Sequence, residues 1–144
     1  MFLELLYSLS CFCVMPTFLN LYFYKTDLLY KKELMTVMVS QSIIGWTSDN
    51  YSLISTNYLS KLLIKLDTIH VSCLALPFLF YYIYINNLNY EIEYFFYALL
   101  FWINQRIIYR NKGNNKQLYK LTLWNHIGWH YFIGLFIYNS FDNI

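Results

Sequence analysis

Five apolar stretches, separated by short polar breaks, decide what this chain can fold into. No stretch alternates apolar and polar residues with period 2, and the stretches are too long for strands, so we expect each to be an α-helix. The predicted fold class is therefore all-α, with one helical domain over residues 1–144. The stretches are Phe2–Tyr24, Leu34–Trp46, Leu59–Ile85, Tyr90–Ile108 and Leu121–Tyr138.

The second stretch is the weakest of the five. It is short for a membrane span, which needs about 20 residues. A polar segment, Thr47–Tyr58, follows it, and the helix either ends before that segment or extends into it. Pro16 and Pro77 are expected to kink the first and third helices.

The composition indicates that these helices lie in an apolar environment. Apolar residues make up 58% of the chain and charged residues 12%, whereas a soluble domain carries roughly 25% charged residues. We therefore predict an integral, multi-pass membrane protein with about five transmembrane helices. The alternative is an apolar subunit of a larger assembly. The net charge of +2 excludes a nucleic-acid-binding module, which needs a clustered excess of Lys and Arg.

Two sites place ionisable groups inside apolar stretches, where a charge costs roughly 2.5–3.5 kcal/mol at the centre of a span. Asp67 and His70 are three residues apart and share one helical face. His126 and His130 are four apart, so their imidazoles stack one turn from each other. Two ring nitrogens at this spacing can converge on one metal ion. Zn²⁺ is the expected ion, because catalytic zinc takes three protein ligands and keeps one position open for water.

Simpler interpretations of these residues stay open. Asp67 can pair with Lys65 or cap its helix, and His70 can bond a backbone carbonyl. His126 and His130 can lie at the membrane interface without a metal. The three cysteines lack C-x-x-C spacing, so we expect small buried apolar residues rather than disulfides. They are Cys11, Cys13 and Cys73.

The two motifs together resemble the CREST superfamily of membrane hydrolases, which includes alkaline ceramidases, adiponectin-receptor-like (PAQR) proteins and hemolysin III proteins. The final helix, His126-Ile-Gly-Trp-His130 followed by Gly134-Leu-Phe-Ile-Tyr, is similar to the last helix of alkaline ceramidases. The segment Leu66-Asp67-Thr-Ile-His-Val-Ser-Cys73 is similar to the Leu-Asp entry into an earlier helix of that family. The resemblance implies that both histidines ligate zinc and that Asp67 orients the attacking water.

The chain departs from the family pattern at the third ligand. The family has Ser-x-x-x-His on the helix before the Asp, and the nearest match here is Ser42-Ile-Ile-Gly-Trp46. The resemblance thus implies a catalytic role for Ser42, while Trp46 cannot ligate zinc. Either the site is degenerate or His70 completes it. Family members have seven helices, so five would be a reduced version of that fold.

Three functions are compatible with these residues. The leading expectation is a zinc-dependent hydrolase of a lipid amide such as a ceramide, with membrane lipid as its surroundings. The second is a non-catalytic membrane protein on the same scaffold. The third is a structural subunit of a viral or organellar membrane complex, suggested by the abundance of Asn, Ile and Tyr.

Overall fold

The computed structural model describes residues 2–24, 28–54, 57–111 and 115–142, and over these residues the fold is all-helical. The helices form five rods, which confirms the expected fold class and number of helices. The first rod consists of α1 (Phe2–Leu9), the 3₁₀ turn η1 (Ser10–Phe12) and α2 (Met15–Tyr24), and the second is α3 (Lys31–Ile54). The third rod consists of α4 (Tyr58–His70), the π-helical turn η2 (Val71–Ala75) and α5 (Leu76–Ile85). The fourth is α6 (Ile92–Asn111) and the fifth is α7 (Lys116–Asp142).

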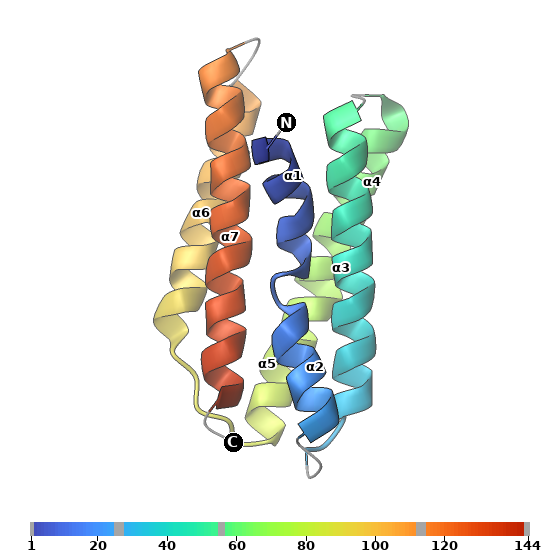
Figure 1. The fold of residues 1–144 in the computed structure, drawn as a ribbon, viewed down its shortest axis with the longest axis vertical. Helices are drawn as coiled ribbons and strands as arrows, with labels where there is room; N and C mark the ends of the chain where they lie inside the picture. The colour runs from blue at the N-terminus through green and yellow to red at the C-terminus, as the bar shows by residue number, and fades with distance from the viewer. Residues whose placement is uncertain (1, 25–27, 55–56, 112–114, 143–144) are drawn as a thin grey trace.

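The rods are arranged as two pairs with the first rod between them (Figure 1). The fourth and fifth rods, α6 and α7, pack along each other, and α3 packs along α4. The first rod lies between the pairs and contacts both α3 and α7. This position lets one short segment reach side chains from both sides of the bundle.

The α3 helix extends into the polar segment rather than ending before it. Polar side chains there bond backbone carbonyls within the helix: Thr47 Oγ1 donates to the Ile43 carbonyl at 2.8 Å, and Asn50 Nδ2 donates to that of Trp46 at 2.8 Å. These bonds satisfy the side chains without ending the helix. Asp49 is thereby carried on the inner face of α3, where it is buried.

Both prolines follow local breaks in the helices. Pro16 occupies the second position of α2, just after the 3₁₀ turn, where its missing N–H costs nothing. Pro77 follows the π-helical turn Val71–Ala75. A wider turn at this point avoids the clash of the proline ring with the carbonyl four residues earlier. The expected kinks thus take the form of changes in helix type.

The interior is polar in part and the exterior is largely apolar. Buried apolar side chains include Phe18, Leu34, Leu79 and Phe136. A second group of buried residues is polar or charged, namely Ser8, Ser42, Ser48, Asp49, Ser60, Thr122, Asn125, His126 and Ser140. Many large apolar side chains lie exposed on the outside, on every rod. A buried polar group of this size, together with so many exposed large apolar side chains, is unusual for a water-soluble domain.

Two of the rods are long and apolar enough to cross a membrane over the described residues. They are the segments Phe2–Asn20 and Tyr58–Ile85. The first comprises α1, η1 and part of α2, and the second comprises α4, η2 and α5.

Two glycines on α7 provide a test of the packing. A Cβ on Gly128 would lie 2.5–2.9 Å from three ring carbons of Phe101 on α6, whereas one on Gly134 would lie 3.4 Å from the nearest atom, Cys13 Sγ. Overpacking costs about 1–3 kcal/mol. Replacing Gly by Ala in a helix that can accept it gains up to about 1 kcal/mol.

We therefore expect Gly128→Ala to lower the thermal unfolding midpoint in detergent, and Gly134→Ala, the matched control, to leave it unchanged or raise it. Equal midpoints for the two variants would contradict the close approach of α6 to α7.

Candidate metal centre

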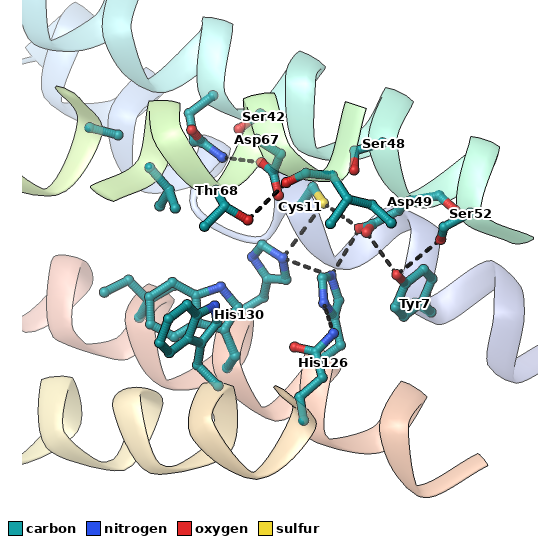
Figure 2. A pocket seen from close by; sticks show the side chains of 18 of the residues that line it. Tyr7, Cys11, Ser42, Ser48, Asp49, Ser52, Asp67, Thr68, His126 and His130 are labelled. Carbon is teal, nitrogen blue, oxygen red and sulfur yellow. Dashed lines mark hydrogen bonds and ion pairs between the residues drawn. The ribbon is translucent and has the colours of Figure 1, made fainter. Parts of the chain in front are cut away.

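Two histidines from α7 form one side of the centre. His126 and His130 lie one helical turn apart, as the spacing predicts, and their Nε2 atoms are 3.0 Å from each other. The rings meet edge to face, with centroids 4.6 Å apart. The Nε2 atoms of both rings face α3 and the first rod (Figure 2).

A carboxylate from α3 faces the histidines. Asp49 is only 4% exposed, and its Oδ2 lies 2.9 Å from His126 Nε2. Its Oδ1 accepts a hydrogen bond of 2.8 Å from the Tyr7 hydroxyl of α1. The Tyr7 ring packs on His126 with centroids 4.3 Å apart. A buried carboxylate needs such partners, since an unpaired charge in the interior costs several kcal/mol.

The fourth member comes from the break in the first rod. Cys11, on the turn Ser10–Phe12, points its Sγ between the two sides. The thiol donates to Asp49 Oδ2 at 3.0 Å and lies 3.6 Å from His130 Nε2. Gly45 on α3 makes room for it, because a Cβ there would lie 3.2 Å from the sulfur.

These four residues can hold one metal ion. Their ligand atoms all lie within 4.8 Å of one another. Asp49 Oδ2 lies 2.9 Å from His126 Nε2 and 3.0 Å from Cys11 Sγ. His130 Nε2 lies 3.0 Å from His126 Nε2 and 3.6 Å from Cys11 Sγ. In tetrahedral zinc sites with metal–ligand bonds of about 2.0 to 2.3 Å, ligand atoms are about 3.3 to 3.7 Å apart. Slight outward movement of the side chains would complete that geometry.

The hydrogen-bond pattern also suits a cation. The Nε2 atom of His126 faces both Asp49 Oδ2 and His130 Nε2, at 2.9 and 3.0 Å. A single ring proton cannot serve both. A cation between them would instead accept a lone pair from each of the three atoms.

An outer contact orients one of the imidazoles. His126 Nδ1 lies 2.9 Å from the side-chain amide of Gln105 on α6. The contacting atom is Gln105 Nε2, which donates to Nδ1 and places the ring proton on His126 Nε2. A half-turn of the amide would bring its oxygen to the ring, accept the Nδ1 proton and leave Nε2 free to bind a metal. Metal-binding histidines in proteins usually have such a partner on the second ring nitrogen.

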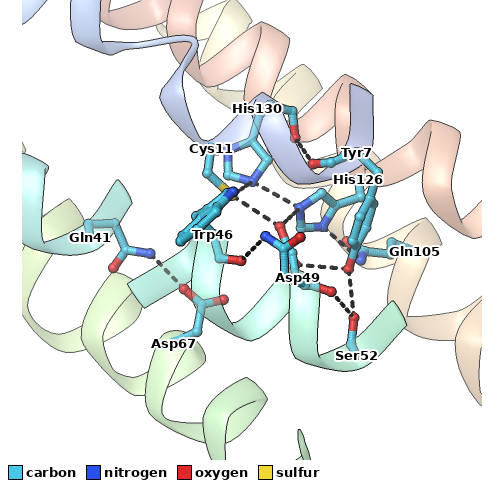
Figure 3. A network of polar contacts seen from close by, with 12 residues as sticks. Tyr7, Cys11, Gln41, Trp46, Asp49, Ser52, Asp67, Gln105, His126 and His130 are labelled. Carbon is cyan, nitrogen blue, oxygen red and sulfur yellow. Dashed lines mark hydrogen bonds and ion pairs between the residues drawn. The ribbon is translucent and has the colours of Figure 1, made fainter. Parts of the chain in front are cut away.

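Asp67 lines the same cavity as the four candidate ligands but is not one of them. Its Oδ1 accepts a hydrogen bond of 2.7 Å from Gln41 Nε2 (Figure 3). The other end of that amide, Gln41 Oε1, is 2.6 Å from His70 Nδ1. Ser40 Oγ lies 3.2 Å from His70 Nε2. His70 is therefore tied to Asp67 through Gln41, and the structure does not bring it to the two other histidines.

The cavity has a volume of about 130 Å³ and joins the metal-ligating group to Asp67. Ser42 also lines it, but its hydroxyl faces Met15 Sδ at 3.7 Å rather than Asp67 or either histidine. Its polar lining includes Thr68, Gln105 and Arg106, and its apolar lining includes Val14, Leu79, Ile133 and Ile137.

Asp49 and Cys11 were not among the residues predicted from the sequence. Trp46, at the position matched to the family's third histidine, is 42% exposed, while Asp49, three residues later, offers a candidate ligand atom. Asp49 falls seven residues after Ser42, so a helix extended through the polar segment would have placed both on one face. Cys11 has no comparable local signal, because its partners lie 38 and 119 residues away.

No protein-family model, curated protein or solved structure matches this chain. The resemblance to the CREST superfamily thus stays a prediction from the two motifs.

The three histidines provide an internal control for metal binding. We expect wild-type protein to bind about one zinc per chain, and His126→Ala combined with His130→Ala to bind none, because two of four ligands are lost. His70→Ala, the matched control, should keep its zinc. Elemental analysis of protein purified in detergent checks this, and zinc that survives the double substitution would contradict the site.

Proposed function

We propose that this protein is a membrane-embedded, zinc-dependent hydrolase of a lipid amide of the ceramide type. The observation that carries the proposal is that Asp67 and three potential metal ligands, Asp49, His126 and His130, line one cavity. A carboxylate beside a metal site can act as the general base for metal-assisted hydrolysis.

The donor set favours zinc over the hard cations. Imidazole and thiolate groups suit zinc, whereas magnesium and calcium prefer oxygen ligands throughout. In such a site a zinc ion supplies a Lewis acid and makes water nucleophilic at neutral pH.

Asp67 is placed to move the proton. Gln41 holds Oδ1 at 2.7 Å, and among the described residues the other carboxylate oxygen makes no hydrogen bond. That oxygen can accept a proton from the attacking water. As the water oxygen bonds to the amide carbon and the C–N bond breaks, Asp67 returns the proton to the leaving nitrogen. The products are a carboxylic acid and an amine.

The cavity suits an amphiphile. Its apolar part, lined by Val14, Leu79, Ile133 and Ile137, would contact the acyl chain of such a substrate. Its polar part carries Arg106, whose Nη2 donates to Thr68 Oγ1 at 2.6 Å. The guanidinium carbon lies 5.3 Å from the centre of the Trp102 ring. This end offers hydrogen-bond donors to a polar headgroup.

A membrane location is supported by the buried polar group and by the exposed apolar side chains. Asp49, His126 and several hydroxyl groups are buried, while large apolar side chains are exposed on all five rods. Exposed apolar surface of this extent marks contact with lipid or protein. The two segments long enough to cross a membrane agree with a multi-pass arrangement, and the polar groups enclosed by α3 and α7 suit helices that face the bundle interior.

One observation favours a second function. Cys11 gives the site a fourth protein ligand, and zinc sites closed by four ligands are usually structural. A non-catalytic membrane protein in which zinc fastens three rods together is the alternative.

Asp67→Asn separates the two functions. The substitution keeps the shape of the side chain but removes the base, so we expect zinc to stay bound and hydrolysis to fall by about 10²–10⁴-fold. Release of fatty acid from a fluorescent ceramide in detergent micelles measures the rate. Glu93→Gln, an exposed carboxylate on α6, is the matched control and should keep full activity. Hydrolysis unaffected by Asp67→Asn would contradict the assignment.

A further inference from the structure

The fourth candidate ligand, the Cys11 thiol, comes from a different kind of element than the other three. The three other ligand atoms come from the interiors of two long helices, α3 and α7, of 24 and 27 residues. Cys11 comes instead from a turn of three residues between two short helices. Such a turn has few helical hydrogen bonds to hold it in place.

The sulfur also lies on the side of the group that faces the base. A Cβ added to Gly45 would lie 3.2 Å from Cys11 Sγ and 3.5 Å from Asp67 Oδ1. The thiol and the Asp67 carboxylate therefore approach the same point of α3. A water molecule between Asp67 and the metal ligands would compete with the sulfur for this space.

We infer that Cys11 is a displaceable fourth ligand that keeps the metal site closed to water until the turn Ser10–Phe12 moves. This inference rests on the proposed function, since it assigns Cys11 a role at the same metal. It explains how a site with four protein ligands can still be hydrolytic: the thiol holds the resting state, and its departure provides the open position that catalysis requires.

The other two cysteines do not share this position. Cys13 donates its thiol to the His130 carbonyl at 3.0 Å and is exposed, as is Cys73 on the π-helical turn. Their exposure also differs from the buried position expected for all three. Among the described residues, Cys73 makes no hydrogen bond to any of the four candidate ligands. Its replacement therefore provides the matched control for Cys11 variants.

Cobalt(II) is a suitable probe, because zinc has a filled d shell and no visible spectrum. We expect cobalt-loaded wild-type protein to show a near-ultraviolet thiolate-to-cobalt charge-transfer band, and azide to leave its visible spectrum unchanged. Cys11→Ala should keep the cobalt, lose the band and respond to azide. Cys11→Ser, a closer match in shape, should lose the band if the alanine variant does not fold, and Cys73→Ala should behave as wild type.

Activity provides the second readout. If the open form is about a tenth of the resting population, Cys11→Ala should raise ceramide hydrolysis roughly tenfold. Bound cobalt without a thiolate band in wild type would overturn the inference and leave the proposed function standing. A band without a rise in hydrolysis on removal of Cys11 would show a permanent ligand and also overturn it. Failure of wild type to bind cobalt would overturn both.

Discussion

The structure depends on one buried carboxylate. Asp49 is enclosed at the centre of the bundle, where an ionised group without partners would cost several kcal/mol. Its two oxygens contact Tyr7 and Cys11 from the first rod and His126 from α7. The desolvation cost of a single group thus fixes how three rods meet. A cation among the same atoms would neutralise the charge and strengthen that junction.

Much of the fold follows from local pattern. Five apolar stretches become five helical rods, because runs of this length without period-2 alternation favour helices. The stacking of His126 on His130 follows from helical periodicity alone. Asp67 lies in their cavity, as the two motifs together predicted. The helices and the histidine pair depend on residues within one or two turns of each other, which a sequence displays directly, whereas the meeting of Asp67 with the histidines depends on packing between distant segments.

The rest of the site depends on contacts that local pattern does not display. The segment after Trp46 has the composition of a loop, yet its side chains bond within α3 and extend the helix to Asp49. Cys11 reaches His130 across 119 residues, and only the packing of the first rod between the two pairs creates that contact. His70 was the available third histidine, but its Nδ1 contacts Gln41, which in turn bonds Asp67. Membrane insertion of all five rods remains a prediction.

Zinc K-edge X-ray absorption of the purified protein tests the central claim most directly. If Cys11, Asp49, His126 and His130 coordinate one ion, the spectrum will show one sulfur at about 2.3 Å and three nitrogen or oxygen atoms at about 2.0–2.2 Å, with the multiple scattering typical of imidazole. Protein without zinc, or a zinc shell of oxygen atoms that lacks the imidazole signal, would contradict it.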